Sequence, residues 1–291
     1  SDVDGTITIS TGTVDANGTF DAEDGSITFT DAGHLTLFST VTGLGILSSD
    51  NGTVAYDGAG DQGIVEDIYY NLTAGSGGIK TLGGDVTVTN DLTINTDVTI
   101  AMDTHDLSVT NATDIDGTLA VADNILTLDG ASDIDGTITI STGTVDANGA
   151  FDATFGEITF TGVGNLTLAS TVESLGTLSG NGTVTYDGTD QGIYGYAYYN
   201  LVADGNGIKT LGGDVSVTDD LTIDNDVTIA MDVYDLTVTD TTNVDGTLAV
   251  ADNTLTLDGA SDIDGTITVN TGTIDANGIF DATGGIITFT G

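Results

Sequence analysis

Three features of the sequence predict an all-β fold, a right-handed parallel β-solenoid (β-helix) with about 19 residues per turn, built from repeats of about 130 residues. The chain repeats itself over a long period, its apolar residues alternate with threonine, and its aspartates recur at a shorter spacing. Crossover connections between parallel strands are almost always right-handed, which gives the predicted sense of the coil.

The long repeat is visible as near copies of one segment. Residues 1–22 return almost letter for letter at 132–153 and again at 261–282. We therefore divide the chain into a first copy at 1–131, a second copy at 132–260 and the start of a third copy at 261–291. Because repeats of this kind stack on their neighbours, we expect one continuous solenoid and not separate domains.

The composition favours strands joined by tight turns. The 291 residues include 42 glycines, no proline and 45 acidic residues, but only two that are Lys or Arg. Thr, Val and Ile suit strands, whereas Asp, Asn and Gly suit turns. Helix formers such as Lys, Arg and Glu are nearly absent, so we expect almost no helix.

A shorter period gives the length of a turn. Asp97, Asp116 and Asp135 lie 19 residues apart, and Leu107 and Leu126 share that spacing. At this spacing each copy holds about seven turns and the whole chain about fifteen.

Alternation within the short strands predicts which side chains face the core. In segments such as 137–140 (T-I-T-I), the aliphatic side chains share one face and the threonines the other. The residues expected inside are Leu126, Leu128, Ile138, Ile140, Phe151 and Phe160.

The formal net charge of −43 excludes nucleic acid and anionic membranes as partners, because both require a basic surface. No apolar run approaches ~18 residues, so no membrane insertion is expected. Like charge opposes compaction. Bound divalent cations, a saline medium or widely spaced turns would each make the charge tolerable.

A recurring D-x-D-G motif supplies the candidate metal ligands. Two carboxylates at a glycine-assisted turn, stacked above another such pair, suit a hard cation such as calcium. The alternative is that Asp and Gly simply form turns. The candidate ligands are Asp2, Asp4, Asp114, Asp116, Asp133, Asp135, Asp262 and Asp264.

Threonine rows and tyrosine clusters are candidate binding surfaces. Flat T-x-T rows on a solenoid would suit ice, although Thr is also the ordinary outward residue of an exposed strand. Tyrosines suit glycan stacking or subunit contact, or else they cover the core at a strand edge. The rows are Thr6/Thr8, Thr137/Thr139 and Thr266/Thr268, and the clusters are Tyr69/Tyr70 and Tyr194, Tyr196, Tyr198 and Tyr199.

The sequence offers no catalytic or cofactor-binding residues, and we expect a protein that is not an enzyme. His34 and His105 align with Asn165 and Tyr234, so neither recurs between copies. Arg is absent, although β-helix lyases and hydrolases rely on Arg or Lys bases or on confined carboxylate pairs. Two lysines recur, in the motif I-K-T-L-G-G, and we expect them to be solvated or paired with carboxylates; they are Lys80 and Lys209.

Residues 69–94 (Y-Y-N-L-T-A-G-S-G-G-I-K-T-L-G-G-D-V-T-V-T-N-D-L-T-I) resemble the repeats of giant bacterial β-strand-repeat surface proteins. Those repeats are similar in style to filamentous-haemagglutinin and autotransporter-like adhesins. The resemblance implies an extracellular or cell-surface structural component of a fibre, stalk or surface layer, whose partners are copies of itself. The alternatives are an adhesin that binds glycans through its Tyr or Thr faces and, less favoured, a glycan-active β-helix enzyme or an ice-binding protein.

Overall fold

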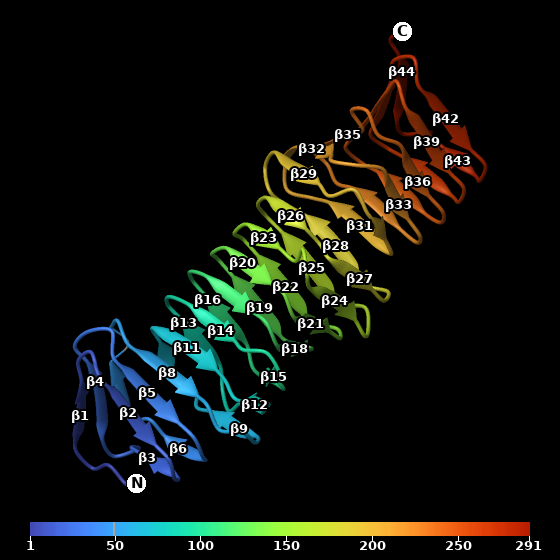
Figure 1. Ribbon diagram of the computed structural model, residues 1–291. Coiled ribbons are helices and arrows are strands. Elements are labelled where there is room, and N and C mark those ends of the chain that lie inside the picture. Colours follow the sequence, from blue (N-terminus) through green and yellow to red (C-terminus); the bar gives the residue numbers. More distant parts are fainter. Residues whose placement is uncertain (49) are drawn as a thin grey trace.

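The computed structural model describes residues 1–48 and 50–291 as an elongated rod of stacked turns, with the two termini at opposite ends (Figure 1). Within those residues 44 strands follow one another, from β1 (Thr6–Ile9) to β44 (Ile286–Phe289), and every paired strand is parallel to its partner. The described residues form no helix, and so none that is long and apolar enough to cross a membrane. The predicted all-β parallel β-solenoid of about fifteen turns is therefore confirmed, and the right-handed sense of the coil stays a prediction.

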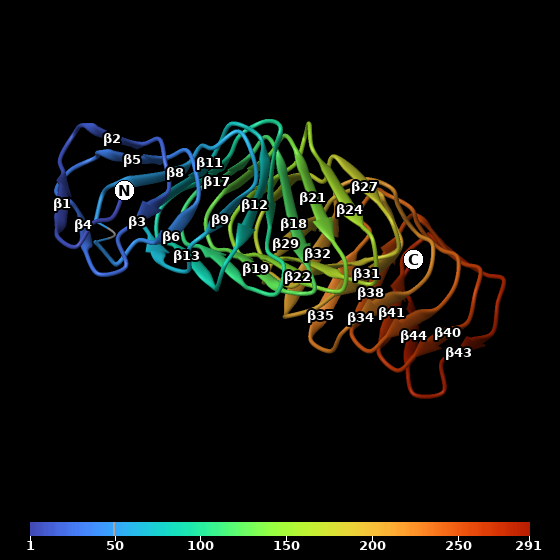
Figure 2. The ribbon, with the colours of Figure 1, turned by 90° about the horizontal axis from the view of Figure 1, so that it is seen from below.

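Each turn contributes one strand to each of three faces. For example, β5 pairs with β8 and β8 with β11, so two further strands lie between successive members of one face. Figure 2 shows the same stack of turns from below. Paired residues lie between 17 positions apart, as in Thr183 and Asn200, and 22 positions apart, as in Asp21 and Gly43.

The first face holds two sheets. They are a three-stranded sheet, β1, β4 (Ser26–Phe29) and β7 (Ile46–Ser48), and a twelve-stranded sheet, β10 (Ile68–Tyr69), β13 (Val86–Val88), β16 (Leu107–Val109), β19 (Ile125–Leu128), β22 (Thr144–Ala147), β25 (Asn165–Leu168), β28 (Thr183–Tyr186), β31 (Asn200–Ala203), β34 (Leu221–Ile223), β37 (Thr242–Val244), β40 (Ser261–Ile263) and β43 (Phe280–Asp281).

The second face also holds two sheets. They are a nine-stranded sheet, β2 (Thr13–Ala16), β5 (His34–Leu37), β8 (Thr53–Tyr56), β11 (Asn71–Ala74), β14 (Leu92–Ile94), β17 (Thr113–Ile115), β20 (Ser132–Ile134), β23 (Phe151–Asp152) and β26 (Val172–Ser174), and a six-stranded sheet, β29 (Gln191–Ile193), β32 (Gly207–Leu211), β35 (Val227–Ala230), β38 (Thr247–Ala251), β41 (Thr266–Val269) and β44.

The third face holds three sheets. They are a pair, β3 (Phe20–Asp21) and β6 (Val41–Gly43), a seven-stranded sheet, β9 (Gln62–Ile64), β12 (Gly78–Leu82), β15 (Val98–Ala101), β18 (Thr118–Ala122), β21 (Thr137–Ile140), β24 (Glu157–Phe160) and β27 (Thr177–Ser179), and a five-stranded sheet, β30 (Ala197–Tyr198), β33 (Val215–Val217), β36 (Leu236–Val238), β39 (Thr254–Leu257) and β42 (Thr273–Ala276).

The core is a column of aliphatic side chains between the three faces. Along each strand buried residues alternate with outward ones, as in β21, where Ile138 and Ile140 are buried and their threonine neighbours are partly exposed. Parallel register stacks like on like, so Leu107 pairs with Leu126 and Leu126 with Val145. All six residues predicted to face the core are buried: Leu126, Leu128, Ile138, Ile140, Phe151 and Phe160.

The turn and the sequence repeat have different lengths. The T-I-T segment of β1 returns in β21 and in β41, so one copy spans twenty strands. With three strands per turn, twenty strands make six and two-thirds turns, in line with the prediction of about seven for each copy but not a whole number. Equivalent strands of successive copies therefore lie on different faces: β1 on the first, β21 on the third and β41 on the second.

No structural boundary marks the limits of the copies. At residue 132, β20 pairs with β17 on one side and β23 on the other, and at residue 261, β40 pairs with β37 and β43. The sheets are interrupted elsewhere, between β6 and β9 and between β7 and β10, and again at the equivalent places in the second copy. The three sequence copies thus form one continuous solenoid within the described residues.

Candidate functional site

The D-x-D-G motif forms one stack of carboxylates on the second face. Asp114 on β17, Asp133 on β20 and Asp152 on β23 are neighbours in register, and all three point outward. Asp116 and Asp135 follow their strands at the corner, where their amides donate to core-strand carbonyls of the preceding turn. Four of the predicted metal ligands therefore lie together.

Like charge and partial burial perturb this stack. Burial raises the pKa of Asp114, and the neighbouring carboxylates of Asp116, Asp133 and Asp135 raise it further. The pKa of Asp133 is raised in the same way, first by burial and then by Asp135, Asp152 and Asp116. Among the described residues no three or more His, Cys, Asp or Glu side chains are arranged to hold a metal ion. The stack is a ladder of repelling carboxylates, and calcium binding there stays a prediction.

The other predicted ligands lie far from this stack. Asp2 pairs with Asp21 beside β3 on the third face. Asp262 lies on β40 on the first face, where its neighbours are Asn243 and Asp281. The structure therefore separates Asp2 and Asp4, and also Asp262 and Asp264, from Asp114, Asp116, Asp133 and Asp135.

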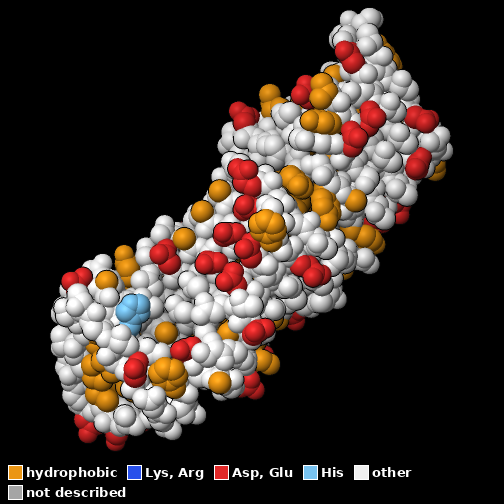
Figure 3. Space-filling view, in the orientation of Figure 1, with side chains coloured by type: hydrophobic (Ala, Val, Ile, Leu, Met, Phe, Trp, Pro, Cys, Tyr) orange, Lys and Arg blue, Asp and Glu red, His pale blue; other side chains and the backbone are white. Residues whose placement is uncertain are grey.

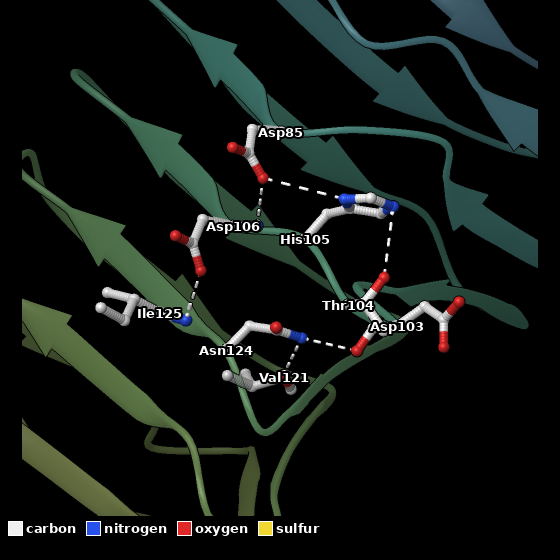
Figure 4. Close-up of polar contacts among 8 residues, drawn as sticks. All are labelled: Asp85, Asp103, Thr104, His105, Asp106, Val121, Asn124 and Ile125. Carbon is white, nitrogen blue, oxygen red and sulfur yellow. Dashed lines mark hydrogen bonds and ion pairs between the residues drawn. The ribbon is translucent and has the colours of Figure 1, made fainter.

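Many other aspartates join consecutive turns, as Figure 4 shows at one corner. The Asp106 amide donates to Asp85 Oδ1 at 3.0 Å, and the Ile125 amide donates to Asp106 Oδ1 at 2.9 Å. We call these inter-turn Asp contacts: a carboxylate accepts a backbone N–H from the turn that follows it. The same contact joins Asp61 to Ile79, Asp91 to Ala112, Asp123 to Thr142, Asp190 to Ile208, Asp214 to Asp235, Asp235 to Thr254 and Asp252 to Thr271.

One of the two histidines, His105, belongs to this surface network. His105 Nδ1 lies 3.8 Å from Asp85 Oδ1, and Thr104 Oγ1 lies 3.4 Å from His105 Nε2 (Figure 4). Asn124 Nδ2 closes the same corner by donating to the Asp103 carbonyl at 2.7 Å. His34 is exposed on β5, on the second face. Within the part of the chain that the structure describes, neither histidine belongs to a group of three or more His, Cys, Asp or Glu side chains that could hold a metal ion.

The predicted threonine rows do not form one plane. Thr8 lies on β1, Thr139 on β21 and Thr268 on β41, which belong to the first, third and second faces. Within a face the outward column is also mixed, since Thr139 lies between Ala120 and Thr159. The regular flat array that ice binding requires is therefore not built by these rows.

Two tyrosines of the first copy are buried and hydrogen-bonded to each other. The hydroxyls of Tyr56 and Tyr69 lie 2.9 Å apart, and Tyr69 Oη donates to the Val65 carbonyl at 2.6 Å. Burial raises the pKa of Tyr56 to about 12. Tyr69 therefore supports the core beside a sheet interruption. This agrees with the alternative given above, in which the tyrosines cover the core at a strand edge. Its neighbour Tyr70 is half-buried.

The second copy repeats this pair and adds two more rings. The hydroxyls of Tyr186 and Tyr198 lie 2.8 Å apart. Tyr196 Oη accepts the Leu178 amide at 3.0 Å, across the interruption between β27 and β30. The first copy has Asp67 at the position of Tyr196. Beside this ring lies an open groove of about 450 Å³, lined in part by Tyr196, Asp214, Asp235 and Thr237.

Both lysines are fully buried, so the expectation of solvated or carboxylate-paired lysines is wrong. Lys80 Nζ donates to the carbonyls of Gly58 at 2.5 Å and Gly60 at 2.9 Å. Lys209 Nζ donates to the carbonyls of Gly188, Thr189 and Asn206. No ion pair joins either amine to a carboxylate within the described residues.

A buried glutamine accompanies each lysine. Gln62 is the register partner of Lys80, and its Nε2 donates to the carbonyls of Leu37 and Ser39, just before β6. We call Gln62 and Lys80, and likewise Gln191 and Lys209, the polar plug. Burial lowers the pKa of the Lys80 amine, and the carboxylates of Asp57 and Asp61 oppose that shift.

The polar plug carries hydrogen bonds at the place where the third face is interrupted between β6 and β9. Sequence reasoning missed it, although a signal exists: Gln and Lys recur 18 residues apart in both copies, as Gln62 with Lys80 and as Gln191 with Lys209.

Comparisons of the chain with protein-family models, with curated proteins and with solved structures found no match. The resemblance of residues 69–94 to bacterial surface repeats accordingly stays a prediction.

Proposed function

We propose that the chain is a non-enzymatic structural rod, a section of an extracellular fibre, stalk or cell-surface layer. The observation that supports this most is the uninterrupted stacking across the copy limits, where β20 and β40 each have a paired strand on both sides. In such an array each turn is stabilised by its neighbours, so stability adds up along the rod. At ~4.8 Å per strand layer, about fifteen turns span about 70 Å, and further copies extend the reach in proportion.

Copies of the repeat are the proposed partners. Residues 132–162 lie inside the rod with turns stacked on both of their sides, and residues 1–31 and 261–291 have nearly the same sequence. Those segments are therefore chemically suited to a further turn on each side, because an open strand edge templates another strand. The array can extend along one polypeptide or by stacking of separate chains.

Sedimentation velocity of the purified 291-residue chain, with electron microscopy of the same sample, tests this proposal. We expect association that increases with concentration and gives end-to-end rods of unchanged width. A chain that stays monomeric at high concentration, with slowly exchanging amides in both terminal turns, would contradict it.

A specific observation also supports an adhesin as a second candidate. The second copy adds Tyr196, which lines the groove together with Asp214 and Asp235, and Tyr194, whose ring centroid lies 6.3 Å from that of Tyr196. Aromatic faces next to carboxylates suit sugar rings. If the chain is an adhesin that uses this groove, Tyr196→Ala should abolish the binding of neutral oligosaccharides, measured by NMR titration. Tyr70→Ala is the matched control, since Tyr70 is a half-buried tyrosine of the first copy, where no such ring cluster exists. Equal titration curves for the wild-type chain and Tyr196→Ala would exclude this groove.

A further inference from the structure

The sequence repeat is not a whole number of turns long, and this determines which face of the rod carries each strand of a copy. One copy spans twenty strands, and three strands complete a turn, so a strand and its equivalent in the next copy are six turns and two faces apart. On a rod with three faces, two faces forward is the same as one face back. The same displacement holds for every equivalent set that can be traced: β3, β23 and β43 lie on the third, second and first faces. Three successive copies thus occupy all three faces.

The interruptions of the sheets follow the same rule. The gap between β6 and β9 is on the third face, and its equivalent between β26 and β29 is on the second. The gap between β7 and β10 is on the first face, and its equivalent between β27 and β30 is on the third. The displacement is therefore a property of the whole repeat and not of one strand set.

We propose that the repeat displays its surface radially: each added copy turns the same outward side chains by one face about the rod axis. The axial step is about 32 Å, from six and two-thirds turns of ~4.8 Å each. A partner of molecular size, including a neighbouring rod, meets the same surface on all sides of the array. A flat partner, such as an ice face or a mineral, meets it only at every third copy, about 96 Å apart.

This inference deepens the proposed function, because radial display matters only if the rod is used as an array. Carboxylates are spread along the whole length of the face that Figure 3 shows. The geometry itself can be measured on the single chain. Its failure is thus distinguishable from failure of the fibre proposal, which is decided by association between chains.

Spin-label distances test the rotation. The chain has no cysteine, so Thr8→Cys, Thr139→Cys and Thr268→Cys can be labelled in pairs at outward positions of β1, β21 and β41. If all three labels lay on one face, the 8–268 distance would equal the sum of the 8–139 and 139–268 distances. With rotation by one face per copy it falls short of that sum by about 13 Å, for labels about 15 Å from the axis.

A matched set on one face calibrates the measurement. Thr87, Thr185 and Asp281 point outward from β13, β28 and β43, three members of the twelve-stranded sheet at equal intervals of five turns. For cysteines there we expect the long distance to equal the sum of the two short ones. If the long distance equals the sum of the two short distances in both sets of labels, the proposed rotation is wrong.

Simultaneous binding of several sites to a flat surface tests whether the rotation keeps a flat partner from reaching successive copies. The two triple-cysteine chains are biotinylated through a short arm and bound to a flat surface coated with monomeric avidin. Mass spectrometry first verifies that both chains carry three biotins. From the flat surface, the one-face chain should dissociate at least about 100-fold more slowly than a singly labelled chain, because its sites bind together. The rotated chain should dissociate within about tenfold of the single-site rate, and equal avidity of the two chains would refute radial display.

Discussion

At the scale of single residues, the surplus of aspartate over glutamate has a structural cause. The carboxylate of an inter-turn Asp contact must reach a backbone N–H of the adjacent turn, as Asp106 Oδ1 reaches the Ile125 amide at 2.9 Å. The short Asp side chain does this at a turn with little loss of rotamer freedom, and Asp is already favoured there. Part of the negative charge therefore holds neighbouring turns together.

The two kinds of aspartate should respond to pH in opposite ways. Asp114 and Asp133 have raised pKa values, so their contribution to stability is present below pH ~4 and lost as pH rises through the folded-state pKa. Hydrogen bonds from Thr142 lower the pKa of Asp123, so its contribution is present at neutral pH and lost as pH falls.

We expect Asp114→Asn with Asp133→Asn to raise the denaturation midpoint at pH 7 and to have little effect at pH 3, because the substitution removes only the repulsion between charged groups. Asp123→Asn should lower the midpoint at pH 7 and lower it by less at pH 3, because the stabilisation is lost progressively as pH falls through the lowered folded-state pKa. Urea unfolding at the two pH values checks both variants in the presence of a chelator. Destabilisation by the double variant at pH 7 would show that the ladder does not repel.

A second residue-scale prediction concerns hydroxyls in the core. Thr113 and Thr242 occupy equivalent buried positions on β17 and β37, and within the described residues their Oγ1 atoms have no hydrogen-bond partner. An unpaired buried hydroxyl costs free energy, and Val has nearly the same shape without it. Thr113→Val and Thr242→Val should each raise the free energy of unfolding by about 1 kcal/mol. Thr127→Val, at an outward position of β19, should leave it unchanged, and destabilisation by the core variants would argue against unpaired hydroxyls.

Which side chains point inward could be predicted from the sequence, whereas the groups that bind the buried lysines could not. Period-two alternation places Ile138 and Ile140 in the core whatever the exact turn, because one face of each strand is buried. A buried ammonium needs several oxygens from a corner that folds over it, here the carbonyls of Gly58 and Gly60. Nothing in a local pattern reveals that those carbonyls point inward.

At the scale of the element, the polar plug replaces strand pairing at an interruption. Between β6 and β9 the sheet is broken, and Gln62 Nε2 donates instead to the carbonyls of Leu37 and Ser39. Lys80, one turn further on, holds the corner that precedes β9. The tyrosine pair lies at the next interruption, between β7 and β10, because Tyr69 is on β10, so buried polar groups gather where backbone pairing fails.

Removing the lysine should therefore weaken this corner. Lys80→Met keeps most of the side-chain volume but leaves the carbonyls of Gly58 and Gly60 without a donor, and unpaired buried carbonyls are costly. We expect a net loss of about 1–3 kcal/mol in the free energy of unfolding, since relief of the buried charge offsets part of the cost. Ile79→Met, an exposed neighbour on β12, is the control. A Lys80→Met variant as stable as the wild type would mean that the carbonyls find other donors.

At the scale of the whole molecule, the net charge of −43 makes stability depend on ions. Monovalent salt screens repulsion between turns, so we expect the melting temperature of the chelator-treated chain to rise with added sodium chloride. If calcium also binds the D-x-D-G stack, chelation should lower the melting temperature by more than monovalent salt can restore. Equal melting temperatures with and without chelator, at fixed ionic strength, would leave screening as the whole explanation.

The whole-molecule fold followed from the repeat, but the orientation of the copies did not. A 19-residue spacing between aspartates such as Asp116 and Asp135 predicts the turn length. Turn lengths vary from 17 to 22 residues, as the pairs Thr183–Asn200 and Asp21–Gly43 show. Dividing the repeat by the 19-residue spacing gave about seven turns per copy, and only the strand pairing shows that the number is six and two-thirds.

The narrow range of register separations also bears on how the chain acquires its structure. Every paired strand finds its partner about twenty residues away, so no loop longer than that must close at any stage. Loop-closure entropy, which slows the folding of most β-proteins, is therefore the same small cost for each turn and does not grow with chain length. Such a chain can fold vectorially, one turn at a time, on the template of the turn just completed. Its folding time should increase only in proportion to the number of copies.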